Sequence, residues 1–246
     1  MPIYVINLRR IMRNARPFLV ICSILVAIGI MLGSISHAYS DDNYSDVMNG
    51  VEQRVIIIDA GHGGEDSGAV GVDGTLEKDL NMQLSMLIGE ELKSRGYTVV
   101  YTRTEDKLLY SEEENIKGIR KISDLKNRCK ISFQYDDPVF ISVHMNTYGA
   151  SKYSGLQVYY TDENDESKNL ARSIQNNVKN SIQKENTRQT KAGKNLYILE
   201  NCNGTGVLIE CGFLSNEEEC RKLSEKEYQK QLSFAIVCGI IEYINL

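Results

Sequence analysis

VIIIDAGHGGEDSGAVG, residues 55–71, joins a short apolar run to a glycine-rich turn that carries one histidine, His62. The β-branched run is typical of a strand covered on both faces, as in a parallel sheet. The glycines that follow allow the backbone to turn tightly or to approach a ligand closely. Ligands of open α/β sheets bind beyond the carboxyl ends of the strands, which makes His62 a candidate functional residue. A loop histidine without a function is the alternative interpretation at this point.

Strand-like and helix-like segments alternate along the rest of the chain. Short apolar runs predict further strands at 97–101, 139–144, 156–160, 196–199 and 206–210. Apolar residues at helical spacing predict helices from about 75 to 96, 123 to 134, 170 to 182 and 228 to 243. The charged segment 105–122 and the polar segment 184–195 are expected to be a surface excursion and a loop. This alternation predicts a single α/β domain with a mostly parallel sheet of about six strands flanked by helices.

Residues 1–38 have the composition of an export segment. Four arginines precede an apolar run, 18–35, that is long enough to span a bilayer or to form the core of a signal peptide. Small residues at Ser36 and Ala38 permit cleavage after Ala38. We therefore expect a signal peptide or membrane anchor that places the rest of the chain on the outer side of the cytoplasmic membrane, either secreted or anchored.

The remaining boundaries follow from composition. Residues 39–53 are polar and aperiodic, which predicts a linker, and residues 54–246 have the size of one folded domain. The net charge of −5 argues against a nucleic-acid partner, because phosphate contacts need a basic surface. Contact with a membrane is expected only through the N-terminal segment.

Three of the expected strands lead into residues that can bind metals or transfer protons. His62 follows the first strand, His144 ends the strand at 139–144, and Glu210 ends the strand at 206–210. In a parallel sheet these side chains share one edge. Two imidazoles and one carboxylate form a common catalytic zinc ligand set, and a second carboxylate then serves as general base.

The candidate carboxylates are Glu65, Asp66, Glu77 and Glu210. Glu77 lies in the first turn of the expected helix and points back toward the sheet edge, although the helix dipole alone also favours an acid there. Glu210 has no such local reason, and burial of an unpaired carboxylate is costly, so a functional role is favoured. Glu65 and Asp66 are expected to hydrogen-bond within their own loop.

Two further polar residues, Arg103 and Asn146, follow expected strands. Each could contact a substrate or tie loops together, and the sequence favours neither interpretation.

Four motifs resemble one known family. The stretch at 55–71, the acid Glu77, FISVHMN (140–146) and LIECGFLSN (208–216) are similar to the zinc-dependent N-acetylmuramoyl-L-alanine amidases, over residues 54 to about 243. The resemblance implies that residues 54–246 are a zinc amidase catalytic domain. It also implies that His62, Glu77 and His144 bind one Zn²⁺ per chain and that Glu210 is catalytic.

The reaction implied by the resemblance is hydrolysis of the amide between N-acetylmuramic acid and the L-alanine of the peptidoglycan stem peptide by a zinc-activated water. A bare catalytic domain behind an export segment looks most like the germination-specific, spore-cortex type. This resemblance implies a role in cell-wall or cortex remodelling and a location that includes the developing spore. It also implies a possible protein activator. The alternatives are a zinc peptidoglycan peptidase or deacetylase, and a non-catalytic peptidoglycan-binding or regulatory module. One departure concerns the family pattern Arg-x-x-x-Ala-Asn on the helix before His144. Here Arg128 is followed by Ser132 and Phe133 in place of the Ala-Asn pair, which weakens the case for a substrate role of that helix.

Overall fold

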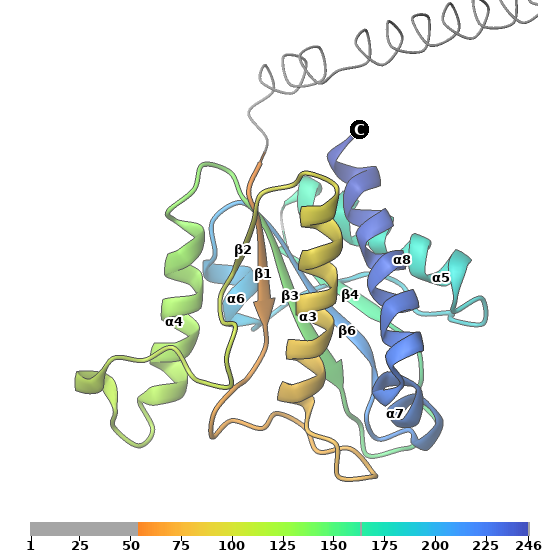
Figure 1. Ribbon diagram of the computed structural model, residues 1–246, viewed down its shortest axis with the longest axis horizontal. Helices are drawn as coiled ribbons and strands as arrows, with labels where there is room; N and C mark the ends of the chain where they lie inside the picture. The colour runs from red at the N-terminus through yellow and green to blue at the C-terminus, as the bar shows by residue number, and fades with distance from the viewer. Residues whose placement is uncertain (1–53, 163, 246) are drawn as a thin grey trace, which may run out of the picture. The chain divides into compact units, whose positions relative to one another are not determined.

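The computed structural model describes residues 54–162 and 164–245. In these residues six strands form one sheet in the order β2-β1-β3-β6-β4-β5 (Figure 1). The strands are β1 (Ile56–Ala60), β2 (Val99–Tyr101), β3 (Val139–Asn146), β4 (Gln157–Tyr160), β5 (Lys191–Ala192) and β6 (Thr205–Phe213). All neighbours pair in parallel except β4 and β6, which are antiparallel. The predicted α/β domain with a mostly parallel sheet is confirmed.

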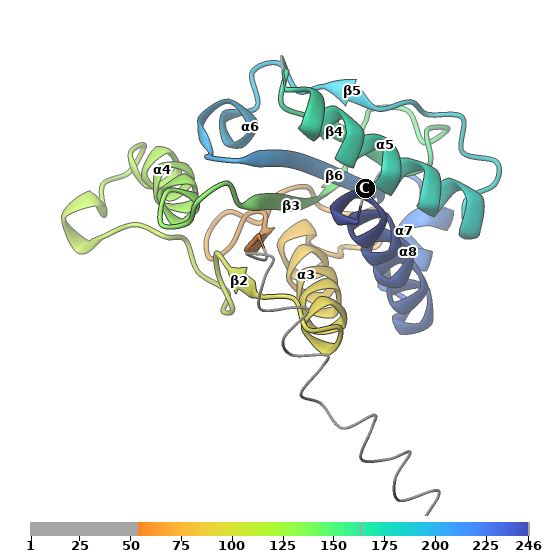
Figure 2. The ribbon, with the colours of Figure 1, turned by 90° about the horizontal axis from the view of Figure 1, so that it is seen from above.

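Helices cover both faces of this sheet. They are α3 (Glu77–Ser94), α4 (Arg120–Ser132), α5 (Asp165–Ser181), α6 (Tyr197–Asn201), α7 (Glu217–Ser224) and α8 (Lys226–Ile244), with a short 3₁₀ helix η1 (Glu112–Glu114). Figure 2 shows α3, α5 and α8 on one face and α4 and α6 on the other. Among the described residues, no helix has the length and apolar character that a membrane crossing needs. The export segment and linker predicted at 1–38 and 39–53 lie outside the described residues.

The two faces of the central strands explain the uninterrupted apolar run that opens the domain. Ile56 and Ile58 are buried in the larger core cluster under α3, α5 and α8. Ile57 lies in a smaller cluster with Phe140 of β3 and Ile198 of α6. Side chains alternate along a strand, so Ser142 and His144 share the face of Phe140. The second histidine therefore projects on the side of the sheet covered by α4 and α6.

Two local expectations differ from the structure, and one helix had not been expected. The segment predicted as a strand at 196–199 is the short helix α6, because four apolar residues bury Ile198 and Leu199 equally well in one helical turn. The loop predicted at 184–195 contains the two-residue strand β5. The helix α7 was not predicted, although Asn216 caps it by accepting a hydrogen bond from the Glu219 amide (3.1 Å).

Candidate metal centre

Three side chains from separate parts of the chain meet at the carboxyl ends of the central strands. His62 follows β1, Glu77 is the first residue of α3, and His144 is near the end of β3. One ligand atom from each lies within 4.8 Å of the others. This edge lies at the bottom of Figure 1, where the orange segment after β1 leads into α3. The predicted convergence of the two histidines is present, and the group could hold a metal ion.

The Oε1 atom of Glu77 is the centre of the group. It lies 3.0 Å from Nδ1 of His144 and 3.2 Å from Nε2 of His62, and the two imidazole rings stand edge to face with centroids 5.0 Å apart. Burial alone would raise the pKa of Glu77, but the two imidazoles outweigh it and hold the pKa far below its ordinary value. The carboxylate therefore stays ionised, as a metal ligand must.

Backbone amides hold the carboxylate of Glu77 in place. Its Oε2 accepts a hydrogen bond from the amide of Ala69 (2.7 Å), and its Oε1 accepts one from the amide of Met145 (3.1 Å). These donors come from the glycine-rich loop and from β3. The orientation of Glu77 is therefore fixed by the fold, which is the support that metal-binding carboxylates commonly have.

Asp66 orients the first histidine. Its Oδ2 lies 3.0 Å from Nδ1 of His62, so the opposite ring nitrogen, Nε2, faces Glu77. Burial would lower the pKa of His62, but Glu77 and Asp66 outweigh it and raise that pKa. The sequence predicted that Asp66 bonds within its own loop, and its Oδ1 does accept from the amide of Gly68 (3.3 Å). Its contact with His62 was not foreseen, although the i,i+4 spacing in the glycine loop was visible.

Two glycines leave the space that the metal donors occupy. A Cβ on Gly61 would lie 2.2 Å from Cε1 of His144. A Cβ on Gly68, whose φ is +65°, would lie 2.5 Å from Oε2 of Glu77. Any larger residue would displace a ligand, so these positions require the close approach that only glycine allows.

Glu210 lies next to the three donors. It is the register partner of His144 on the neighbouring parallel strand β6. Burial raises the pKa of Glu210 to about 7. In the described part of the chain its Oε2 is buried and has no hydrogen-bond partner. A buried, unpaired carboxylate oxygen is costly, which indicates that another group completes its environment in the working protein.

Two arginines clamp the loop that carries His62. Arg128 on α4 donates to the carbonyls of Ala60 (2.6 Å) and His62 (2.7 Å), and Arg103 donates to the carbonyls of Ala60 (2.8 Å) and Gly61 (3.0 Å). Both arginines are buried. Arg103 thus ties loops together, which resolves one of the open sequence interpretations. Arg128 likewise has a structural role, which agrees with the departure from the family pattern at Ser132 and Phe133.

The charged excursion contacts the same loop. Asp106 accepts from the amide of Gly64 (2.7 Å) and pairs with Lys78 of α3 (2.6 Å), and Arg120 contacts Glu65. Most of segment 105–122 is exposed, as predicted. It also buttresses the outer side of the glycine-rich loop.

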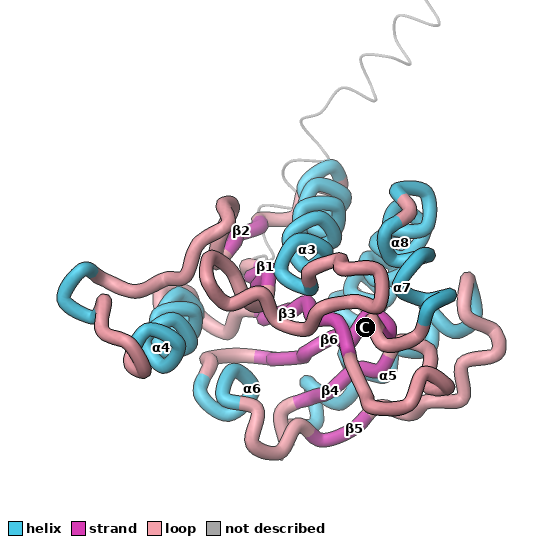
Figure 3. Tube along the Cα trace, turned by 90° about the horizontal axis from the view of Figure 1, so that it is seen from below, coloured by secondary structure: helices cyan, strands magenta, loops and turns pink. Residues whose placement is uncertain are grey.

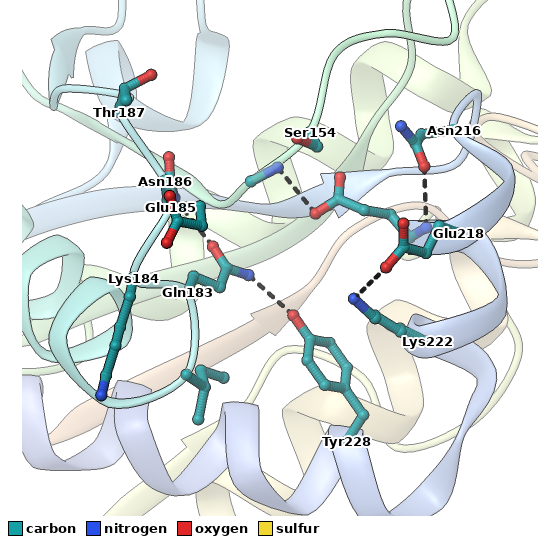
Figure 4. Close-up of a pocket in the computed structure, with 13 residues that line it drawn as sticks. Ser154, Gln183, Lys184, Glu185, Asn186, Thr187, Asn216, Glu218, Lys222 and Tyr228 are labelled. Atoms are coloured by element: carbon teal, nitrogen blue, oxygen red, sulfur yellow. Dashed lines mark hydrogen bonds and ion pairs between the residues drawn. The ribbon is translucent and has the colours of Figure 1, made fainter.

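Asn146 differs from Arg103 because it lines a hollow of about 550 Å³ beside Glu210. Another hollow lies among segment 182–187, α7 and α8 (Figure 4). The close-up shows its polar side chains bonded to one another: Gln183 donates to the Tyr228 hydroxyl (2.9 Å), and Lys222 pairs with Glu218 (2.6 Å). Neither Glu210 nor the metal-binding group lines it. The hollow beside Glu210 is therefore the candidate substrate site.

Residues 56–242 match the family described as N-acetylmuramoyl-L-alanine amidase. The chain belongs to this family. The germination-specific N-acetylmuramoyl-L-alanine amidase of Bacillus subtilis (strain 168) is 32% identical to this chain, which we call the amidase from here on. The match extends over 224 residues, which cover 91% of this chain and 94% of that relative. The predicted membership of the amidase family is confirmed, and a germination-specific amidase is among the relatives of this chain.

Solved structures agree with this assignment. The CwlD amidase from Clostridioides difficile, solved in complex with the GerS lipoprotein, is 40% identical to this chain with a TM-score of 0.75. The match covers 78% of this chain and 99% of the CwlD chain. The amidase AmiC2 of Nostoc punctiforme is 29% identical with a TM-score of 0.68 and covers 78% and 98%. The amidase therefore acts on peptidoglycan, in cell-wall or spore-cortex remodelling.

Proposed function

We propose that the amidase holds one zinc ion with His62, Glu77 and His144 and uses Glu210 to transfer protons. The observation that supports this most strongly is the meeting of the three ligand atoms within 4.8 Å, with Glu210 on the strand beside His144. Two imidazole nitrogens and one carboxylate suit zinc, which is borderline-soft, and leave a position for water. Zinc bound there would polarise a carbonyl and lower the pKa of water.

Each residue of the site then has a separate role in the reaction. Glu210 takes a proton from the attacking water and later gives it to the departing alanine nitrogen. The carbonyls of Ala60 and His62 stay fixed by Arg128, so the His62 ring keeps its orientation. Asp66 holds Nδ1 of His62, which leaves Nε2 to bind the metal. The balance of the reaction is one water consumed, one C–N bond broken, and one carboxyl and one amino group formed.

Product analysis tests the bond that is cleaved. Peptidoglycan fragments digested by the zinc-loaded amidase should yield intact stem peptides with a free L-alanine amino group and N-acetylmuramic acid without a peptide, as identified by mass spectrometry. Cleavage within the stem would assign the alternative peptidase activity, and loss of acetyl groups would assign the deacetylase activity. If the zinc-loaded protein bound peptidoglycan without cleaving it, both alone and together with its protein partner, the non-catalytic alternative would replace the proposal.

The location of the amidase and its protein partner are further parts of the proposal. We infer that residues 1–38 export the chain as a signal peptide or anchor it, because peptidoglycan lies outside the cytoplasmic membrane. The CwlD amidase forms a complex with the GerS lipoprotein, which supports a protein partner for this amidase too, and we propose that such a partner is its activator. N-terminal sequencing of the mature protein would distinguish cleavage after Ala38 from a retained anchor.

A further inference from the structure

The hollow beside Glu210 extends across the strands that lie farthest from β1. Besides Asn146 and Glu210, its lining consists of Tyr159, Lys191, Ala192, Lys194 and Leu196. Figure 3 looks onto this edge of the sheet and shows β6, β4 and β5 in succession beyond β3. The hollow therefore starts at the proposed proton-transfer residue and leads away from the metal ligands.

Cations gather at the far side of this hollow. Lys191 and Lys194 both line it and are exposed. Arg188 does not line the hollow, but it donates to Oε1 of Gln157 (2.9 Å), two residues before the lining residue Tyr159 on β4. Glu210 is the one acid among the residues that line the hollow in the described part of the chain. In a protein whose net charge is −5, this local excess of positive charge favours an anionic ligand.

The position of Glu210 fixes which half of the substrate crosses this hollow. Glu210 must reach the departing nitrogen to protonate it, so that nitrogen lies on the Glu210 side of the scissile carbonyl. The nitrogen belongs to the first residue of the stem peptide. The peptide chain therefore runs from Glu210 toward β4 and β5, away from the loop that carries His62.

Distances along the sheet and along the peptide agree. Two strand spacings, from β6 across β4 to β5, amount to about 10 Å. An extended peptide advances roughly 3.4 Å per residue, so the second stem residue lies within about 7 Å of the departing nitrogen. Lysine carries its charge on a flexible four-carbon stem that can reach back over this distance. The acidic second residue of a stem peptide thus comes within reach of the cations.

We propose that this hollow is the stem-peptide site of the amidase and that Lys191 and Lys194 bind the free carboxylate of the second, acidic stem residue. This inference rests on the proposed function. Both lysines come from the segment that forms β5 and leads to α6. They act as specificity residues, because they contact the substrate away from the reacting atoms.

A pair of substrates that differ in one group tests the proposal. One is N-acetylmuramoyl-L-alanyl-D-glutamate with its γ-carboxyl blocked as the methylamide and its α-carboxylate free, and the other is the same compound with the α-carboxylate amidated as well. The wild type should show a kcat/KM about 2- to 5-fold higher for the acid, mainly through KM, as for an exposed charge pair. The double variant Lys191→Gln, Lys194→Gln should lose this preference, and the variant Lys191→Arg, Lys194→Arg should keep it.

Matched controls separate this charge effect from a general one. The double variant Lys226→Gln, Lys230→Gln removes two exposed lysines of α8 and should keep the wild-type preference. If the wild type hydrolyses the acid and the amide equally well, or if the glutamine variant at 191 and 194 retains the preference, this inference is overturned while the amidase function stands. If the zinc-loaded wild type cleaves neither these compounds nor peptidoglycan, alone or together with its protein partner, the proposed function fails and the inference fails with it.

Discussion

His144 on β3 and Glu210 on β6 are register partners on adjacent parallel strands. Strands in a sheet lie about 4.8 Å apart, so this pairing sets a candidate metal donor next to a carboxylate outside the three-donor group. Hydrolysis of an amide at a metal site needs that separation of roles, since one group of residues binds the ion and another moves protons. The register of two strands thus provides much of the geometry that the reaction needs.

Gly61→Ala should weaken metal binding without unfolding the domain. The new Cβ would lie 2.2 Å from Cε1 of His144, so the ring has to move away from Glu77. We expect a loss of zinc affinity of at least tenfold, measured by competition with a chromophoric chelator. Gly149→Ala is the matched control, because a Cβ there meets nothing within 4 Å. Equal zinc affinity for both variants would contradict the packing argument.

Asp66→Asn should reduce zinc affinity by about 10- to 100-fold, as the loss of an outer-shell carboxylate commonly does. The amide no longer provides the negative charge beside Nδ1 of His62, so the ring loses part of its fixed orientation. Isothermal titration with zinc measures the change. Glu65→Gln serves as the control because Glu65 contacts Arg120 instead of a histidine. An unchanged affinity in Asp66→Asn would remove Asp66 from the account of the site.

His144→Ala should lower the zinc content of the purified protein well below one per chain. The variant loses one of three donors and leaves Glu77 with a single imidazole partner. Elemental analysis of dialysed protein measures the content, and circular dichroism verifies that the fold is intact. Full zinc occupancy in this variant would mean that the ion binds elsewhere.

Part of the site and most of the fold could be predicted from the sequence. His62, His144 and Glu210 stood out because polar, ionisable residues end otherwise apolar strands, and a parallel sheet brings such ends to one edge. Glu77 was ambiguous from its position alone, because a helix N-terminus favours an acid with or without a metal. The resemblance of its surrounding motifs singled it out.

Other features depend on tertiary contacts that no local pattern records. The run at 196–199 is too short for its periodicity to separate helix from strand, and its packing against the sheet decides for α6. The role of Asp66 depends on which ring nitrogen of His62 faces Glu77. The hydrogen bond from Arg128 to the His62 carbonyl joins residues 66 positions apart. Such long-range hydrogen bonds become visible only in three dimensions.

Asp59 should make the stability of the domain sensitive to acid. Burial would raise the pKa of Asp59, but Arg128 and the hydroxyls of Ser142 and Thr102 outweigh it and hold the pKa below its ordinary value. A depressed folded-state pKa contributes stability above the unfolded value of about 3.9, and that contribution is lost as pH falls through the folded value. The free energy of unfolding should therefore decrease below about pH 4.

Urea unfolding of Asp59→Asn measures this contribution. At pH 7 the variant should be less stable than the wild type by about 3 kcal/mol, because Arg128 loses a buried partner. Its stability should also change less between pH 5 and pH 3. Asp162→Asn, at an exposed position, should behave like the wild type. The same acid sensitivity in Asp59→Asn and the wild type would show that other carboxylates are responsible.

Glu210→Gln tests the central claim most directly, through zinc content and turnover of peptidoglycan measured on the same preparation. Glutamine keeps the size of the side chain but cannot accept and return a proton, so turnover should fall by a factor of at least about 10² while zinc stays near one per chain. Unchanged turnover would contradict the assignment of Glu210 to proton transfer. Loss of the zinc together with the activity would instead make Glu210 a ligand.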